Sequence, residues 1–241
     1  MTKKAIISPQ KGDQSLRETS SASDISAFLK SAKNTNPSGA GRLIFALDAT
    51  MSRQPTWDRA MTIQASMFDA VGKTENRQSG LLVKLIYFRG FGECRASKWV
   101  MNAGALRDLM TGINCRGGQT QIAKVLSYAR KESARKQVAA LVFIGDAMEE
   151  SLDELCQKAG ELGLKNTRCF FFQEGRDIGT EKAFREMARL SNGAYFHLGP
   201  NSANELANLL GAIAVYARGG LKALSSSENR QHRLLLEQLK K

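Results

Sequence analysis

Residues 42–52 read RLIFALDATMS, an apolar run that ends in a cluster of small oxygen-bearing side chains. A short continuous apolar run is typical of a strand that is buried on both faces of a sheet. Asp48, Thr50 and Ser52 follow at alternate positions, where the chain leaves the sheet. The stretch therefore predicts a central strand with a polar loop at its carboxyl end.

The rest of the chain alternates between strand-like and helix-like patterns. Pro55 is expected to open a helix, whose apolar face would carry Trp57, Met61, Ala65 and Phe68. Further strands are expected at 81–90, 92–100, 137–146, 167–175 and 194–198, and further helices at 103–113, 120–136, 149–162, 180–191 and 203–218. This alternation predicts an α/β fold with a doubly wound, mostly parallel sheet. The tight turn at 90–92 predicts one antiparallel edge strand.

The predicted sheet and its helices form one domain over residues 39–220, because Gly219 and Gly220 are expected to stop the last helix. Residues 1–38 are expected to be a basic, largely flexible arm with a short helix within 21–34. Residues 221–241 are expected to be a basic amphipathic tail with a leucine patch. A helix of about 14 residues is marginal alone in water, so this tail would dock on its own domain or on a partner.

The chain of 241 residues has a formal net charge of +12 and a pI of about 9.7. Residues 1–40 carry six Lys/Arg against three Asp/Glu, and residues 221–241 carry five against two. A basic surface of this kind aids solubility and binds polyanions weakly. Nucleic-acid binding through the termini and the helix at 121–136 is the alternative, although no recognised nucleic-acid motif accompanies the charge.

We do not expect a zinc site with cysteine ligands, and we do not expect export or a membrane span. The four cysteines never form a C-x-x-C pair and the two histidines lie far apart in sequence, so a structural zinc site is not expected. No apolar run reaches the length of about 18 residues that a membrane span needs, and no signal-peptide pattern is present. Free thiols without an export signal indicate a cytoplasmic protein.

Three predicted loops place oxygen-bearing side chains at the carboxyl ends of strands, where open α/β sheets bind their ligands. They carry Asp48, Thr50 and Ser52 after the first strand, Thr120 in the glycine-rich stretch CRGGQT, and Asp146 after the strand at 137–146. Hydroxyl and carboxylate oxygens suit a hard divalent cation such as Mg²⁺ or Mn²⁺. Two simpler interpretations of these polar residues stay open. Ser52 and Thr120 are good helix N-caps, and two glutamates at 149–150 suit the dipole of the helix that they would begin.

Together these elements resemble a von Willebrand factor type A domain with a metal-ion-dependent adhesion site, of the bacterial or intracellular type, over residues 39–220. That family carries D-x-S-x-S after the first strand, a Thr in a glycine-rich loop, and an Asp after the fourth strand. Here Thr50 replaces the middle Ser, and GDAME replaces the more common TDG. The resemblance implies that the hydroxyls of Thr50, Ser52 and Thr120 touch the metal, with Asp48 and Asp146 acting largely through bound water.

The resemblance also implies a function. A free position on the metal would take an Asp or Glu carboxylate from a protein partner, in a non-catalytic adaptor module. Some intracellular relatives work in assemblies with AAA+ ATPases of the MoxR kind. A metal-free relative is one alternative reading. A metal-dependent hydrolase is disfavoured, since the sequence has no P-loop motif and no visible pairing of nucleophile and base.

Overall fold

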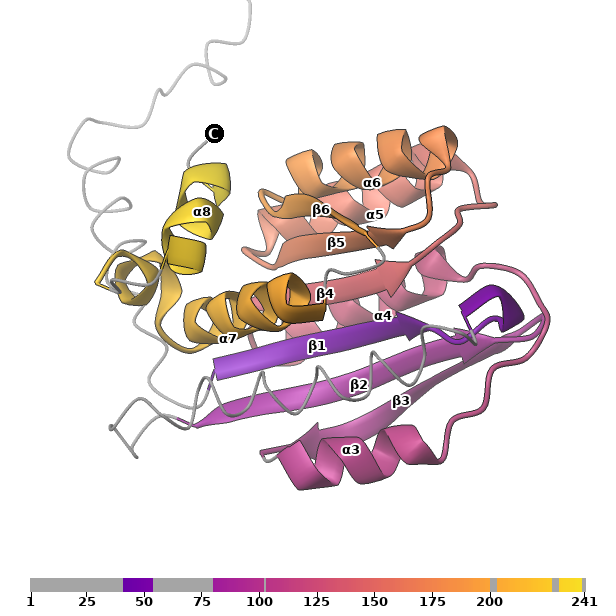
Figure 1. Ribbon diagram of the computed structural model, residues 1–241, viewed down its shortest axis with the longest axis horizontal. Coiled ribbons are helices and arrows are strands. Elements are labelled where there is room, and N and C mark those ends of the chain that lie inside the picture. Colours follow the sequence, from indigo (N-terminus) through magenta and orange to yellow (C-terminus); the bar gives the residue numbers. More distant parts are fainter. Residues whose placement is uncertain (1–40, 54–79, 102, 200–202, 227–229, 240–241) are drawn as a thin grey trace, which may run out of the picture. The chain divides into compact units, whose positions relative to one another are not determined.

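The computed structural model describes residues 41–53, 80–101, 103–199, 203–226 and 230–239, which form a layered α/β domain (Figure 1). Its six-stranded sheet has the order β3-β2-β1-β4-β5-β6. The strands are β1 (Gly41–Asp48), β2 (Leu81–Arg89), β3 (Glu93–Val100), β4 (Ala140–Gly145), β5 (Arg168–Glu174) and β6 (Ala194–Leu198). All neighbours pair in parallel except β2 and β3, so the predicted mostly parallel sheet with one antiparallel edge strand is confirmed.

The helices lie on both faces of this sheet (Figure 1). They are α3 (Ala103–Thr111), α4 (Ile122–Arg135), α5 (Leu152–Leu164), α6 (Ile178–Leu190), α7 (Ala203–Ser225) and α8 (Arg230–Leu239). A short 3₁₀ helix, η1 (Met51–Arg53), follows β1. The helix expected after Pro55 and the N-terminal arm with its short helix lie outside the described residues.

β1 is buried on both faces, as its continuous apolar sequence predicts. Its odd-numbered residues, Leu43, Phe45 and Leu47, join the core that contains apolar side chains of α3, α7 and α8. Its even-numbered residues, Ile44 and Ala46, join the core formed with α4, α5 and α6. Since successive side chains of a strand point to opposite faces, an apolar run of this length can be satisfied only in the middle of a two-sided sheet.

The C-terminal helices pack onto the same domain. Gly220 interrupts α7 with φ +65°, as its sequence predicts, but a further helical turn follows it as far as Ser225. Leu235 and Leu239 of α8 are buried in the core shared with α3 and α7, so this part of the tail docks on its own domain. Within the part of the chain that the structure describes, no helix has the length and apolar character to cross a membrane.

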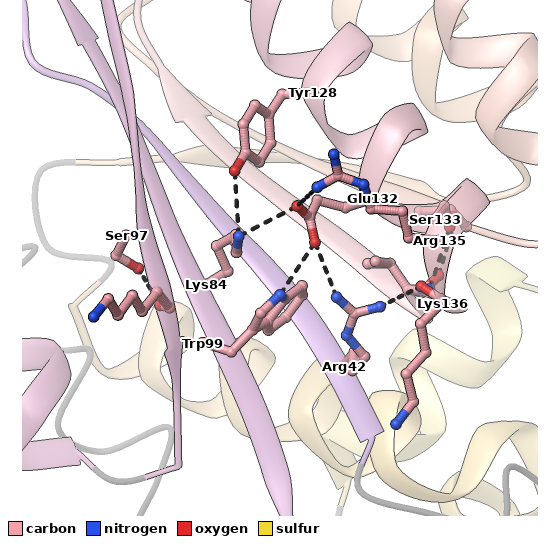
Figure 2. Close-up of polar contacts among 12 residues, drawn as sticks. Arg42, Lys84, Ser97, Trp99, Tyr128, Glu132, Ser133, Arg135 and Lys136 are labelled. Atoms are coloured by element: carbon pink, nitrogen blue, oxygen red, sulfur yellow. Dashed lines mark hydrogen bonds and ion pairs between the residues drawn. The ribbon is translucent and has the colours of Figure 1, made fainter.

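A buried charge cluster joins the first three strands to α4 (Figure 2). The Glu132 carboxylate lies 3.0 Å from Arg42 Nη2 and 3.3 Å from Lys84 Nζ, and it accepts a hydrogen bond of 3.1 Å from Trp99 Nε1. The Lys84 ammonium also donates to Tyr128 Oη at 3.2 Å. The guanidinium of Arg42 lies 3.9 Å from the Trp99 ring centroid, a cation–π distance.

This cluster fixes the position of α4 against the sheet. Arg42 also donates to the backbone carbonyl of Lys136, the C-cap residue of α4, so both side-chain and backbone groups of the helix bind the start of β1. Because α4 begins at Ile122, its placement determines where the glycine-rich loop that precedes it can lie.

Candidate metal centre

Asp48 is the last residue of β1 and Asp146 directly follows β4, so both lie at the same edge of the sheet, at the ends of neighbouring parallel strands. Leu47 of β1 pairs with Ile144 of β4, so the chain leaves the two strands side by side. A Cβ atom built on Gly145 would lie 3.7 Å from the Asp48 Cβ. The two predicted carboxylates therefore come from adjacent strand ends, as the order of elements predicts.

The loop after β1 folds its three polar side chains together. Asp48 is fully buried, and its Oδ1 accepts a hydrogen bond of 2.8 Å from the Thr50 amide, the local turn that Asp commonly forms. Thr50 Oγ1 lies 3.1 Å from Ser52 Oγ. Two adjacent oxygen ligands of Mg²⁺ at 2.0–2.1 Å and at right angles would lie about 2.9 Å apart. The two hydroxyls form a hydrogen bond with each other, at a separation that neighbouring ligands of one octahedral ion would also have.

The glycine-rich loop is held beside this first loop by backbone contacts. Thr50 and Arg116 form an isolated parallel bridge, and the Arg116 amide donates to the Ala49 carbonyl at 3.0 Å. Further along, the Gln119 amide donates to the Gly90 carbonyl in the turn between β2 and β3 at 3.2 Å. Since Thr120 comes next in the chain, these contacts fix its approach to the carboxyl edge of the sheet.

Thr120 is joined to the loop that carries Asp146. Its amide donates to Glu149 Oε2 at 2.9 Å, and the Glu149 amide donates back to Thr120 Oγ1 at 3.1 Å. A hydroxyl oxygen has two acceptor sites, so one remains for a cation. The alternative that Thr120 caps α4 is wrong, since the N-cap residue is Gln121 and the Thr120 hydroxyl accepts its hydrogen bond from the Glu149 amide. Ser52 lies in η1, and the residues it would cap lie outside the described ranges.

Glu149 and Glu150 do not begin the helix that follows β4, which is a correction to the sequence prediction. α5 starts at Leu152, with Ser151 as its N-cap residue. The Glu150 carboxylate instead accepts hydrogen bonds from the amides of Ile122 and Ala123, at 2.7 and 2.8 Å. The negative charge therefore stabilises the N-terminus of α4, and not that of α5, the helix expected from the sequence. Residue type revealed the preference for a helix N-terminus, but only the fold could show which helix.

Replacing Glu150 with Ala is expected to lower the free energy of unfolding by about 1–2 kcal/mol, because two amides of α4 lose their acceptor and the helix N-terminus loses a negative charge. Glu186→Ala is the matched control, since Glu186 lies beyond the first turn of α6 and makes an exposed ion pair with Arg189 at 2.6 Å. It should cost about 0–0.5 kcal/mol. Urea unfolding of both variants measures the difference, and equal losses would contradict the role of Glu150 at α4.

Asp146 supplies an oxygen that fits a cation. Its Oδ1 is buried and has no hydrogen-bond partner within the described residues. A buried acceptor without a partner is costly, and a metal ion or its bound water would satisfy it. The donors gathered at this edge are hydroxyls and two carboxylates. No group of three or more His, Cys, Asp or Glu side chains comes together in the described ranges.

No protein-family model and no curated protein matches this chain in sequence. Solved structures do match its fold. The VWA domain of SpRpn10 is 13% identical with a TM-score of 0.56, over 70% of this chain and 94% of that one. Proximal thread matrix protein 1 from the mussel byssus, with a zinc-occupied MIDAS motif, is 13% identical with a TM-score of 0.57, over 73% of this chain and 45% of that one. Manganese-loaded TRAP protein of Plasmodium vivax is 15% identical with a TM-score of 0.51, over 71% and 73%.

These neighbours share the same layered arrangement although few of their residues are identical to those of this chain. Two of them are described with a divalent metal, zinc in the byssus protein and manganese in the Plasmodium protein. The resemblance that the sequence predicts is thereby confirmed at the level of the fold. This chain has the fold of a von Willebrand factor type A domain.

Proposed function

We propose that this chain is a non-catalytic, metal-dependent protein-binding module. A divalent ion, Mg²⁺ or Mn²⁺, would be held at the carboxyl edge of the sheet by the hydroxyls of Thr50, Ser52 and Thr120. The carboxylates of Asp48 and Asp146 would orient the hydroxyls and bind water on the metal. When bound, the ion would supply a positive charge with an open position that takes a carboxylate from a partner.

The contact that supports this most directly is the 3.1 Å separation of the Thr50 and Ser52 hydroxyls beside the buried Asp48. The buried Asp146 Oδ1, at the end of the neighbouring strand, adds a second oxygen suited to a cation. Because most of the direct ligands would be neutral, the ion would keep much of its charge and attract an acidic group. The remaining acceptor site on the Thr120 hydroxyl completes the proposed ligand set.

The partner that we expect is a protein that presents an Asp or Glu side chain. We expect the assembly to be cytoplasmic and, by resemblance, to include an AAA+ ATPase of the MoxR kind. Purification of the chain with its bound proteins, in Mg²⁺ and again in chelator, addresses this part of the proposal. A MoxR-type ATPase that stays bound in chelator would argue against a metal-bridged contact.

Adding Mg²⁺ or Mn²⁺ is expected to raise the melting temperature of the wild-type chain. At a free metal concentration about ten times the dissociation constant, binding adds about 1.4 kcal/mol of stability. For a domain of this size, that corresponds to a rise of about 3–6 °C. Thermal melting with metal and with chelator measures the rise.

Asp48→Ala is expected to abolish this rise, because the carboxylate that orients the Thr50 amide and the proposed ligands is lost. Each variant is compared with and without metal, so any intrinsic loss of stability cancels. Asp108→Ala is the control, since Asp108 is an exposed residue of α3, and its response to metal should equal that of the wild type. The absence of a rise in the wild-type chain at millimolar metal would contradict the proposed site.

A further inference from the structure

A small cavity lies between α4 and α5, which pack side by side on one face of the sheet. Its volume is about 270 Å³, and its polar lining residues are Lys124, Ser127, Tyr128 and Lys131 of α4 and Glu154 and Lys158 of α5. Sites for drug-sized ligands have about 300–1,000 Å³. The cavity, which we call the lysine pocket, therefore has room for a small molecule or for one group of a larger one.

The lining of the lysine pocket is positively charged. Three ammonium groups line it against one carboxylate, that of Glu154, which leaves a surplus of two positive charges. The Glu154 carboxylate lies 3.5 Å from Lys158 Nζ, in an exposed ion pair of the kind that contributes little. Lys124 Nζ donates only to neutral oxygens, at 2.8 and 3.2 Å. Lys131 is exposed and makes no ion pair or side-chain hydrogen bond with any other described residue.

The other carboxylates near the lysine pocket do not cancel this surplus. Glu161 of α5 is bound to Arg130 at 2.9 Å. Glu150 accepts hydrogen bonds from amides at the start of α4. Asp153, in the first turn of α5, is exposed but does not line the pocket. The charges that face the pocket therefore favour an anionic ligand.

Further positive charge lies behind the Tyr128 wall of the lysine pocket. Tyr128 Oη accepts a hydrogen bond of 3.2 Å from Lys84 Nζ, which lies 5.3 Å from the centre of the Tyr128 ring (Figure 2). Among the described residues, Glu132 is the one carboxylate within ion-pair distance of the two buried cations Lys84 and Arg42. Buried charge without a partner is costly, and an anion in the pocket would offset part of it.

The spacing of the lysines favours a ligand with several anionic groups in a row. Lys124 and Lys131 are seven residues apart on one face of α4, which corresponds to about 10.5 Å along the helix axis. Ser127 lies between them on the same face and supplies a hydroxyl donor. A single phosphate group held by one of these lysines would leave the other without a partner. A row of two or three phosphate groups could bind both.

We propose that the lysine pocket binds a linear polyphosphate group, either free or as the end of a nucleotide. The lysine ammonium groups would bind the phosphate oxygens by charge-assisted hydrogen bonds. None of the residues that line the pocket is a proposed metal ligand, so this binding does not depend on the proposed function.

Isothermal titration of the full-length chain tests this proposal. Chelator is present throughout, because polyphosphates bind divalent metals. Tripolyphosphate should bind at one site, about tenfold or more tightly than inorganic phosphate, since it places charge on more than one lysine. Titration with ATP distinguishes the two sources of the group: affinity equal to that of tripolyphosphate indicates the polyphosphate group itself, and tighter binding indicates a nucleotide. Binding of a single-stranded oligonucleotide but not of tripolyphosphate would overturn the proposal, as would no binding of tripolyphosphate at millimolar concentration.

Variants test whether the lysine pocket is the place of binding. Lys131→Met should weaken the binding of tripolyphosphate about tenfold, because one charge-assisted contact is lost. Glu154→Gln should tighten it about two- to threefold, because the carboxylate that lines the pocket is removed. Effects of opposite sign are not what a general loss of structure would produce.

Lys182→Met is the matched control, since it removes the same charge from an exposed position of α6. Its affinity for tripolyphosphate should equal that of the wild type. Equal weakening by Lys131→Met and Lys182→Met would indicate attraction by net charge alone and would overturn the proposal. Asp48→Ala should bind tripolyphosphate as the wild type does, so a failure of the metal centre and a failure of the lysine pocket are distinguished.

Discussion

Glu132→Gln is expected to lower the free energy of unfolding by about 3–5 kcal/mol, the cost of removing one partner from a buried ion pair. The substitution keeps the volume of the side chain but leaves two buried cations, Arg42 and Lys84, without their shared carboxylate (Figure 2). Glu161→Gln is the matched control, because it removes a half-exposed ion pair with Arg130. The control should cost about 0–1 kcal/mol in urea unfolding. Similar losses in the two variants would contradict a structural role for the cluster.

The pH dependence of stability tests the same group independently. Burial alone would raise the pKa of Glu132, but the hydrogen bond from Trp99 and the charges of Lys84 and Arg42 outweigh it, and the pKa lies below its ordinary value of 4.5. A carboxyl group with a lowered folded-state pKa stabilises the fold above its unfolded pKa, and that contribution is lost as the pH falls through the folded value. The wild-type chain should therefore lose more stability below about pH 4.5 than Glu132→Gln does.

Lys84→Met is expected to lower the free energy of unfolding less than Glu132→Gln does, because the cluster holds two buried cations and one buried carboxylate. Removing Lys84 leaves Arg42 and Glu132 as a balanced pair at 3.0 Å. The double variant of Lys84→Met with Glu132→Gln should be more stable than the sum of the two single losses predicts, since Glu132→Gln then leaves one buried cation without its carboxylate instead of two. Urea unfolding of the three variants provides this comparison, and simple additivity would argue against direct coupling.

The sequence predicts the order of the described helices and strands well, because each of them has a local pattern of apolar, polar and glycine residues. The apolar run of β1, the glycine turn between β2 and β3, and the apolar face of α4 all appear where they are expected. The sequence predicts the first and last residues of the helices less accurately. α6 starts two residues earlier than expected, at Ile178, because Asp177 caps it and Thr180 donates to that cap from inside the first turn.

Contacts between distant parts of the chain could not be read from the sequence. Glu132 lies on a helix rich in Lys and Arg, and its partners are 48 and 90 residues away. One signal was available, since Lys84 interrupts an apolar strand and a charge in that position needs a buried partner. The periodicity of α4 gave no reason to choose Glu132 as that partner. The same limit explains the glutamates at 149–150, whose residue type predicted a helix N-terminus but could not say which one.

Some contacts of the predicted metal ligands follow from the local sequence, whereas others depend on distant parts of the chain. Asp48, Thr50 and Ser52 are close in sequence, and their mutual contacts follow from one short turn. Thr120 reaches the same edge through contacts of its loop with Ala49, Gly90 and Glu149, which come from three other segments. The two glycines of CRGGQT predict a loop that bends towards the loop after β1, and Arg116 does contact Ala49 and Thr50 there, but the further contact with the turn after β2 emerges only from the fold.

Gly118→Ala is expected to lower the free energy of unfolding by about 2–3 kcal/mol, the upper part of the range for inserting an atom into a filled space. A Cβ atom at this position would overlap the backbone carbonyl of Gly90, which cannot move as a flexible side chain can. The loop would have to shift, which would weaken the hydrogen bond from the Gln119 amide and displace Thr120. We therefore also expect the rise in melting temperature with Mg²⁺ to shrink or disappear.

Gly117→Ala is the matched control for this loop. A Cβ atom at Gly117 would meet nothing within 4 Å, although the residue is the immediate neighbour of Gly118. The control should change the free energy of unfolding by no more than about 0.5 kcal/mol, as surface substitutions usually do, and should keep the wild-type response to Mg²⁺. Urea unfolding and melting with and without metal measure both effects in both variants. If Gly118→Ala loses stability but responds to Mg²⁺ like the control, the loop is needed for folding alone, and Thr120 is not a ligand whose position matters to the metal.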